Sequence, residues 1–262
     1  MCRLFALRSS TPCPVYDSLY AADHSLCKQS CGDLQRECHE DGWGVGYYKE
    51  NGAERVRSTR SAALDPFYRE LAQSLRARTV VAHVRQASMG TVAERNCHPF
   101  VHGRWIFAHN GTVVGFPSIR EEVRASLPAR LSQCIQGDTD SEHAFFLILA
   151  RLEKDVGTLE SPQPVQALCE AMASTIRWLE ERSPRDGKEP SRFNFLLTDG
   201  QRLVASRVGH SLFWRKAQKN EGAGAVFIAS EPTTAEEWAE IPDRSLVWVD
   251  SDLNAGTREY AS

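Results

Sequence analysis

The residue best placed for chemistry is Cys2, in the opening stretch MCRLFAL. If an aminopeptidase removes Met1, Cys2 carries both a thiol and a free α-amine, so that one residue supplies a nucleophile and a neighbouring base. A free cysteine is also often a small buried hydrophobic residue without any reactivity. Its position alone leaves both interpretations open, and the other motifs must decide between them.

A second candidate is the pair Asn110 and Gly111 in the stretch FAHNGTV, at the end of an apolar segment. An Asn-Gly pair is a common hairpin turn. The flanking residues, however, do not alternate as a simple hairpin requires, and the pair also offers a side-chain amide next to an unhindered backbone N–H. Two such donors aimed at one point form an oxyanion hole, which stabilises a carbonyl as it becomes tetrahedral.

Charged residues that suit an amino-acid substrate occur in two places. Arg85 ends the stretch VVAHVR, and Asp138, Asp140 and Glu142 lie at the expected start of a helix. A fixed guanidinium binds a carboxylate through two parallel hydrogen bonds, and an aspartate can bind an ammonium group. An internal salt bridge for Arg85 and helix capping for the acidic residues are the alternatives. His83 is expected to be structural.

The set Cys27, Cys31, Cys38 and His39 offers a competing function, because three thiols and an imidazole can bind zinc. The gaps of three and six residues between these cysteines do not match the close pairs of common structural zinc sites. We therefore expect no metal and no cofactor, and interpret these residues as unligated side chains on a loop. Cys169 lies within an expected helix, where packing in the core is its expected role.

The elements that must position these residues are predicted from hydrophobic periodicity and turn signals. Strands are predicted at 3–7, 79–86, 104–113, 210–216, 224–231 and 245–250, with hairpins over 42–58 and 191–209. Helices are predicted at 65–78, 138–154 and 164–182, and the polar segment 20–41 is predicted to be a long loop. This order predicts one α+β domain over 1–262, in which helices sandwich two mostly antiparallel sheets as four αββα layers.

Composition narrows the class of partner. The formal net charge is −3, from 31 basic and 34 acidic residues, so nucleic acid is not an expected partner. No apolar run reaches the roughly 18 to 20 residues of a membrane span, and the N-terminus lacks the layout of a signal peptide. We therefore expect a cytoplasmic protein with reduced thiols, no membrane partner and a small-molecule substrate.

Six stretches together carry a family resemblance. They are MCRLFAL, DGWGVGYY, AHVRQAS, NCHPF, FAHNG and GDTDSE, in this order over residues 2–142. In order and approximate spacing they resemble the class II glutamine amidotransferase domains, which are N-terminal-nucleophile (Ntn) hydrolases. The chain is most similar to the stand-alone branch, which includes YafJ-like bacterial proteins, the amidohydrolase of ergothioneine biosynthesis and a subunit of the fungal glutathione-degrading complex. The resemblance implies the Ntn-hydrolase type of sandwich.

The resemblance also implies catalytic roles. Cys2 would be the nucleophile, and its own α-amine would be the general base once Met1 is removed. An α-amine has a pKa near 8, so it can accept the thiol proton at neutral pH without help from a histidine. Asn110 and the backbone N–H of Gly111 would form the oxyanion hole.

Substrate-binding roles follow from the same motifs. Arg85 would bind the α-carboxylate of the substrate, and Asp140 would bind its α-ammonium. Ser88 would contribute a small hydroxyl to the glutamine pocket, with Gly42 and Trp43 in the wall behind it.

The implied reaction is hydrolysis of glutamine or a γ-glutamyl amide through a γ-glutamyl thioester on Cys2. The chain has no room for the synthase or acceptor domain of larger family members, so the alternative is transfer of ammonia to a separate synthase. An alternative of another class is a non-catalytic metal-binding or regulatory module. The sequence leaves open a separate hydrolase subunit and a homo-oligomer.

Overall fold

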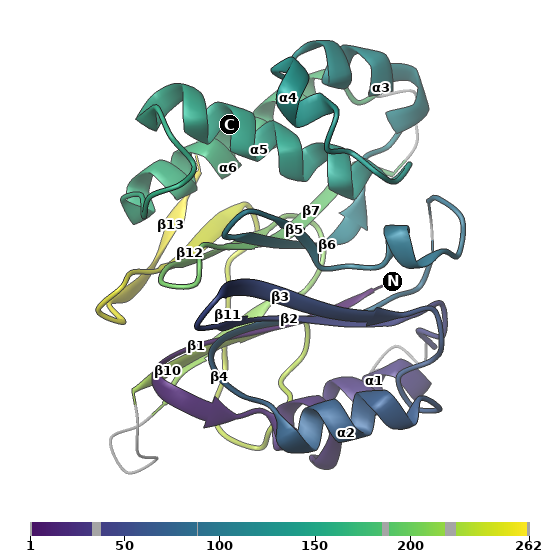
Figure 1. The fold of residues 1–262 in the computed structure, drawn as a ribbon, viewed down its shortest axis with the longest axis vertical. Coiled ribbons are helices and arrows are strands. Elements are labelled where there is room, and N and C mark those ends of the chain that lie inside the picture. The colour runs from purple at the N-terminus through teal and green to yellow at the C-terminus, as the bar shows by residue number, and fades with distance from the viewer. Residues whose placement is uncertain (1, 33–37, 88, 185–188, 218–223, 261–262) are drawn as a thin grey trace.

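The computed structural model describes residues 2–32, 38–87, 89–184, 189–217 and 224–260. In this part of the chain two β-sheets pack face to face, and helices cover the outer face of each sheet, which gives four layers (Figure 1). The predicted α+β fold with an αββα sandwich of two antiparallel sheets is confirmed.

The first sheet carries the N-terminal strand. Within the described residues its order is β11 (Ala239–Glu240), β9 (Phe213–Lys216), β10 (Ala225–Ala229), β1 (Arg3–Pro14), β4 (Arg76–Val84), β2 (Trp43–Lys49) and β3 (Gly52–Ser58). β1 is antiparallel to both of its neighbours, β10 and β4, and Arg3 lies opposite Val84. Cys2 therefore precedes a central strand, at the end of the sheet where β4 finishes.

The second sheet carries the Asn-Gly pair. Its order, again within the described residues, is β13 (Ala255–Glu259), β12 (Ser245–Val249), β8 (Leu203–Arg207), β7 (Arg192–Thr198), β6 (Trp105–Thr112) and β5 (Phe100–His102). β6 and β7 are antiparallel, with Asn110 opposite Asn194 and Gly111 opposite Phe193. The interpretation of Asn110 and Gly111 as a hairpin turn is therefore wrong, because both residues lie within a paired strand.

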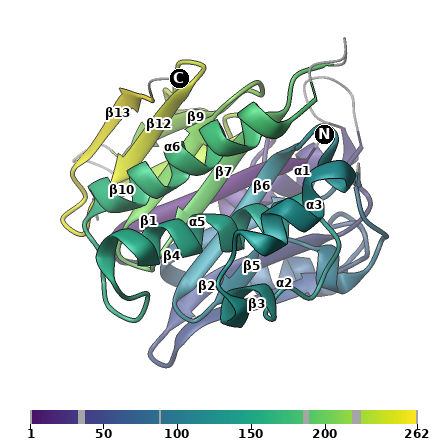
Figure 2. The same cartoon turned by 90° about the horizontal axis from the view of Figure 1, so that it is seen from above.

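The outer layers are helical. The π-helical turn η1 (Asp17–Ala21), α1 (Leu26–Cys31) and α2 (Pro66–Ser74) lie on the side of the first sheet. On the side of the second sheet lie α3 (Phe116–Ala125), α4 (Ala129–Ser132), α5 (Asp140–Val156) and α6 (Val165–Arg182), and Figure 2 shows α5 and α6 crossing that sheet. The 3₁₀ turn η2 (Glu94–Asn96) precedes β5. Among the described residues, no helix is long and apolar enough to span a membrane.

Alternation along β1 decides which way Cys2 points. Phe5 and Leu7 pack in the core between the first sheet and its helices, whereas Leu4 and Ala6 pack in the core between the two sheets. Successive side chains of a strand point to opposite faces. Cys2 shares the parity of Leu4 and Ala6, so its side chain points toward the second sheet.

Most predicted elements are confirmed, and the differences have local causes. The segment 20–41 is not a continuous loop, because it contains α1, which buries Leu26 completely. The elements α3, α4, β5, β11 and β13 lie outside the predicted ones. In α3, Phe116, Ile119 and Val123 are buried at helical spacing, so this helix had a signal in the sequence. The predicted core role of Cys169 in α6 is confirmed, since it is 2% exposed.

Candidate active site

The backbone of Cys2 is anchored by its two following residues. The Arg3 guanidinium donates from Nη1 to the Cys2 carbonyl oxygen at 3.0 Å. It also forms a buried ion pair with Glu231, with Nη2 and Oε1 3.0 Å apart. Leu4 donates its N–H to the Ser230 hydroxyl and accepts the Ser230 N–H, both at 3.0 Å. The start of β1 is therefore fixed on the segment that follows β10.

The Cys2 thiol lies against the backbone just beyond β4. Its Sγ donates to the Gln86 carbonyl oxygen at 3.3 Å and accepts the Gln86 N–H at 3.4 Å. Burial raises the pKa of the Cys2 thiol, although the hydrogen bond from Gln86 and the nearby charges of Arg85 and Arg3 oppose that rise. A raised pKa leaves little thiolate at neutral pH. The sulfur therefore needs a base close by to react as a nucleophile.

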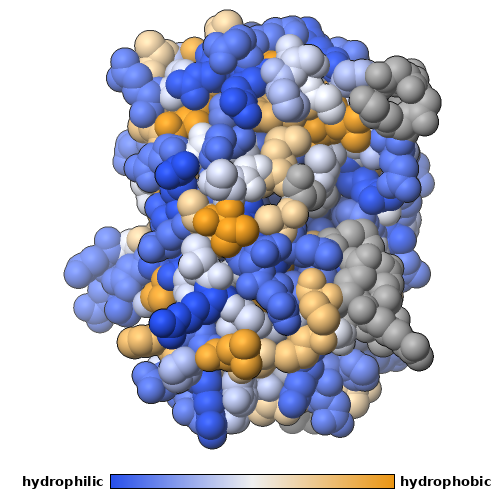
Figure 3. Space-filling view, turned by 90° about the vertical axis from the view of Figure 1, so that its right-hand side faces the viewer, coloured by the Kyte–Doolittle hydropathy of each residue, from blue (hydrophilic) through white to orange (hydrophobic). Residues whose placement is uncertain are grey.

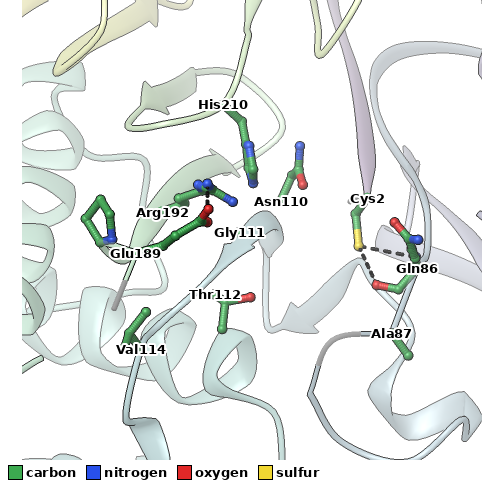
Figure 4. Close-up of a pocket in the computed structure, with 11 residues that line it drawn as sticks. Cys2, Gln86, Ala87, Asn110, Gly111, Thr112, Val114, Glu189, Arg192 and His210 are labelled. Atoms are coloured by element: carbon green, nitrogen blue, oxygen red, sulfur yellow. Dashed lines mark hydrogen bonds and ion pairs between the residues drawn. The ribbon is translucent and has the colours of Figure 1, made fainter. Parts of the chain in front are cut away.

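Asn110 and Gly111 share a cavity with this sulfur. The cavity has a volume of about 380 Å³, and Cys2, Gln86, Asn110 and Gly111 all line it (Figure 4). The Asn110 side chain is 1% exposed, and its Oδ1 has no hydrogen-bond partner among the described residues. A carboxamide brings two N–H donors as well as an oxygen. The structure thus places a polar side chain with unused bonding capacity beside the thiol.

Gly111 is required by its surroundings. A Cβ atom at this position would overlap the carbonyl oxygen of Arg192 and Nε2 of His109, and φ is +157°. The ring of His109 is itself held by Ser141 Oγ at 2.9 Å and by the Arg192 carbonyl oxygen at 3.0 Å. Only glycine lets β6 approach these groups so closely and keeps the backbone of residue 111 beside Cys2.

Arg85 is buried at the end of β4. It is 3% exposed, and its Nη2 donates to the Met89 carbonyl oxygen at 3.0 Å. Its backbone N–H donates to the Gly42 carbonyl oxygen at 2.8 Å, which fixes the strand end. Nη1 is buried and has no hydrogen-bond partner among the described residues. A buried guanidinium with an unused N–H is a binding group for a carboxylate.

Asp140 begins α5 but is not its N-cap. Thr139 is the N-cap, and its hydroxyl accepts the Glu142 N–H. The Asp140 carboxylate instead accepts the N–H of Val113, just beyond β6, at 2.7 Å and the N–H of Ser141 at 2.8 Å. Each carboxylate oxygen can accept two hydrogen bonds. The carboxylate therefore links β6 to α5 and retains capacity for an ammonium group.

Arg85 and Asp140 meet at a second, smaller void. Both line it together with Cys2 and Gly111, and its volume is about 20 Å³. That is roughly the room one water molecule needs. An amino-acid head group can enter only if neighbouring side chains, such as Met89, move outward. The thiol thus separates a small void with a buried arginine from the larger cavity.

The other predicted pocket residues have different positions. Ser88 lies outside the described residues. Gly42 supports Arg85 through its carbonyl oxygen but lines neither space beside Cys2. Trp43 is 1% exposed on the helix side of the first sheet, where its Nε1 donates to Asp65 at 3.0 Å and its ring packs edge-on against Tyr68. Trp43 therefore positions α2 rather than contacting either space.

Two buried histidines near the smaller void were not predicted to belong to the site. His98, from the stretch NCHPF, lines this void, and its ring centroid lies 4.3 Å from that of His83. No nitrogen of either ring has a hydrogen-bond partner among the described residues. Burial holds the pKa of both imidazoles well below the usual value, and the charge of Arg85 lowers both further. Both rings are therefore neutral at pH 7.

The competing zinc set is not assembled. Cys27 is buried, whereas Cys31 and Cys38 are exposed, and Cys38 donates to the backbone oxygen of Cys31 at 3.2 Å. His39 is completely buried. In the part of the chain that the structure describes, no three or more histidine, cysteine or acidic side chains come together in a way that could hold a metal ion.

Comparisons with known proteins identify the family of this chain. Residues 1–223 match the family of class-II glutamine amidotransferases. The chain is 29% identical to the probable glutamine amidotransferase DUG3 of Saccharomyces cerevisiae, over 95% of this chain and 82% of that protein. It is 31% identical to the gamma-glutamyl-hercynylcysteine sulfoxide hydrolase of Mycolicibacterium smegmatis, over 79% of this chain and 76% of that protein.

A solved structure has the same fold. It is a glutamine aminotransferase class-II domain protein from Silicibacter pomeroyi, with a TM-score of 0.71 at 23% identity over 100% of both chains. The family match covers most of the chain and includes Cys2, Arg85, Asn110 and Asp140. The chain therefore belongs to the class II glutamine amidotransferases and is an enzyme.

Proposed function

We propose that the protein hydrolyses glutamine or a γ-glutamyl amide through a γ-glutamyl thioester on Cys2. The observation that carries this proposal is that the Cys2 thiol shares one cavity with Asn110 and Gly111. A nucleophile and two donors directed at one space are what acyl transfer requires. The similarity to the gamma-glutamyl-hercynylcysteine sulfoxide hydrolase of Mycolicibacterium smegmatis supports hydrolysis rather than ammonia transfer.

The reaction begins with removal of Met1, which frees the α-amine of Cys2. The amine takes the thiol proton, and the thiolate attacks the γ-carbonyl carbon of the substrate. The carbonyl oxygen becomes an oxyanion and accepts hydrogen bonds from the Asn110 amide and the Gly111 N–H. The C–N bond then breaks, the proton passes from the α-amine to the leaving nitrogen, and ammonia or an amine departs.

A water molecule completes the cycle. The α-amine takes one proton from this water as the hydroxide attacks the thioester carbonyl, and the C–S bond breaks to regenerate the thiol and release glutamate. The free amine is needed in the first half-reaction because burial raises the pKa of the thiol, and in the second because it takes the proton of the attacking water. While Met1 is present, this base is tied up in a peptide bond.

The substrate is held by its amino-acid head group. Arg85 binds the α-carboxylate, and Asp140 binds the α-ammonium, on the side of Cys2 where the smaller void lies. Fixing both charges places the γ-carbonyl at the sulfur and makes the attack effectively unimolecular. Gly42 supports this side by fixing the strand end that carries Arg85, and Ser88 keeps its proposed role as a small hydroxyl of the glutamine pocket.

Mass spectrometry and an assay of glutamate release test the proposal together. Active protein is expected to lack Met1 and to release glutamate from glutamine or from a γ-glutamyl amide. Cys2→Ala is expected to lower kcat/KM by at least about 1,000-fold, because a nucleophile has no substitute in a covalent mechanism. A glutamine-mimicking diazoketone is expected to add its mass to Cys2. Full activity in protein that retains Met1 would contradict the mechanism.

A further inference from the structure

The larger cavity beside Cys2 has a wall that the catalytic residues do not explain. Cys2 and Gln86 lie on one side of it, while Arg192, Glu189 and His210 lie across from them (Figure 4). The smaller void on the other side of Cys2 already contains the two groups that would bind a glutamyl head group. The larger cavity is therefore on the side where the leaving amine must go.

The size of this cavity exceeds what glutamine needs. Its volume is about 380 Å³. Ammonia is similar in size to water, which occupies about 30 Å³ in the liquid. A subsite that receives only ammonia would not need this room. The space suits a substituted amine instead.

The positive charge on the far wall comes from Arg192. This residue begins β7, where its backbone oxygen accepts from His109, so its position is fixed by the same contacts that fix Gly111. Its Nη2 lies 2.5 Å from Oε2 of Glu189, and the two side chains are 33% and 76% exposed. Exposed ion pairs of this kind contribute little and exchange readily. A carboxylate on the ligand can therefore replace Glu189 on the guanidinium.

His210 completes this wall without adding charge. Its carbonyl oxygen accepts from Asn194 Nδ2 and from Arg207 Nε, both at 3.1 Å, and Asn194 lies opposite Asn110 in the sheet. Burial lowers the pKa of His210 to about 3, and the charge of Arg192 acts in the same direction. The imidazole is neutral at pH 7. Among the described residues that line the cavity, Arg192 thus supplies the positive charge.

We propose that the cavity lined by Arg192 and His210 binds a leaving amine that carries a carboxylate, such as an amino acid or a short peptide. Arg192 forms the two parallel hydrogen bonds that a carboxylate accepts from a guanidinium. The face of the molecule in Figure 3 is largely hydrophilic, with scattered apolar residues. This inference rests on the proposed hydrolysis at Cys2, and it specifies which class of γ-glutamyl amide the enzyme cleaves.

A competing assignment would place the glutamyl head group itself between Arg192 and Glu189. The burial of Arg85, its unused N–H and its position with Asp140 argue against this, because they already provide a matched pair of charges. The two assignments make different predictions. If Arg192 binds the head group, its removal impairs every γ-glutamyl substrate equally, glutamine included.

Substrates that differ only in the carboxylate of the leaving amine test the effect of that group alone. The probes are γ-glutamylalanine, γ-glutamylalanylglycine and the C-terminal amide of each, with glutamine as a substrate whose leaving group is ammonia. We expect the wild-type enzyme to prefer at least one acid over its amide by about 10- to 100-fold in kcat/KM. Arg192→Gln is expected to bring that ratio close to one, and Arg192→Lys to restore part of it.

Arg177→Gln is the matched control. Arg177 lies on α6, outside both spaces beside Cys2, and it pairs with Glu170 at 2.7 Å with 31% of its side chain exposed. This variant loses a comparable ion pair and is expected to keep the wild-type ratio of acid to amide. Circular dichroism and thermal unfolding of both variants show whether each remains folded.

The outcomes distinguish the inference from the proposed function. If the wild-type enzyme cleaves neither glutamine nor any γ-glutamyl amide, the proposed function is wrong. If it cleaves them but treats both acids like their amides, the function stands and the carboxylate subsite is wrong. If Arg192→Gln lowers glutamine, acids and amides by one common factor, Arg192 acts on the head group or on the fold, and the inference is overturned.

Discussion

Arg85 and Arg192 both bring a guanidinium to the surroundings of Cys2, but the protein holds them in opposite ways. Arg85 is 3% exposed and is fixed through its side chain and its backbone. Arg192 leaves 33% of its side chain exposed and faces an acidic partner that is still more exposed. The first is set rigidly before any ligand arrives, whereas the second can change its partner.

This difference matches two kinds of recognition. A buried, preorganised charge gives strong binding to a group of constant shape, because little reorganisation is needed. An exposed arginine with a displaceable partner tolerates ligands of different length. Under our proposals, Arg85 binds the glutamyl half that every substrate shares, and Arg192 binds the amine half that differs between substrates. The following experiments test this division.

The largest expected effect is at Arg85. Arg85→Gln should lower kcat/KM for glutamine and for every γ-glutamyl peptide by about 100- to 1,000-fold, because it removes a buried charge that pairs with a carboxylate. Steady-state kinetics with glutamine and γ-glutamylalanine measure this. Arg85→Lys keeps the charge and should recover only part of the loss. A loss confined to the peptides would reverse the roles of the two arginines.

Gly111 lies at the boundary between the two spaces, so its substitution should impair both halves of the site. Gly111→Ala should lower the free energy of unfolding by about 1–3 kcal/mol, because β6 must move away from Arg192 and His109. It should also lower kcat for all substrates. Gly103→Ala is the control, since its φ is +55° but nothing lies within 4 Å of an added Cβ. Equal effects of the two changes would show that backbone strain alone matters.

The buried imidazoles beside Arg85 predict an acid sensitivity. The pKa of His98 is lowered well below its usual value by burial, so below pH 6.5 the unfolded chain binds a proton that the folded chain does not. The neutral His98 side chain therefore makes its full contribution to the unfolding free energy above pH 6.5, and this contribution is lost as the pH falls. Between pH 7 and pH 5 this loss is at most about 2 kcal/mol for His98, a limit set by the pKa of a free imidazole.

Urea unfolding at several pH values measures that sensitivity. His98→Asn should reduce the dependence of the unfolding free energy on pH by the share of one imidazole, because His83 and His210 still contribute to it. His24→Asn, a change at an exposed position, should leave the dependence as in the wild type. A dependence that is unchanged in the His98 variant would assign the acid sensitivity to other groups.

The smallest expected effect is at Glu189. Glu189→Gln frees Arg192 from its exposed partner, so the wild-type preference for a carboxylate-bearing leaving group should increase about two- to fivefold. The ratio of kcat/KM for γ-glutamylalanylglycine and its amide measures this. A matched change, Glu170→Gln, removes the partner of Arg177 and should leave the ratio unchanged. A lower preference in the Glu189 variant would mean that the carboxylate helps bind the substrate.

The sequence allowed prediction of those site residues that stand where elements end or begin. Cys2 precedes a strand, Arg85 follows one, Asn110 and Gly111 lie near the end of one, and Asp140 opens a helix. Such positions are visible from periodicity, and the structure brings these residues together. The fold class was predictable for the same reason, because the order of strands and helices leaves few ways to bury their apolar faces.

The direction of Trp43 was not predictable in this way. Alternation along β2 shows that Trp43 and Gly44 face opposite sides, but not which side faces the second sheet. In the structure a Cβ at Gly44 would overlap the backbone of His98, whereas Trp43 packs against Tyr68. Glycine permits the close approach of the sheets, so Trp43 must face the helices.

Arg192 and His210 were missed because strand register cannot be determined from one sequence. They come about 80 to 100 residues after Asn110 and reach the cavity only through the pairing of Asn110 with Asn194. His98 lies in the family stretch NCHPF, but it was missed as a site residue because the sequence does not show that its imidazole is buried beside Cys2. Long-range pairing therefore determines the part of the site that we propose for the leaving amine.

The contacts that hold the start of β1 show how far the functional unit extends along the chain. The family match stops at residue 223, yet Ser230 and Glu231 hold the residues directly after Cys2. A recombinant fragment trimmed to the matched region would lack Ser230 and Glu231, so the start of β1 would lose these contacts and keep those with β4 and Gln86. The boundary of similarity is therefore not the boundary of the functional unit, because the segment after β10 fixes the residues that follow Cys2.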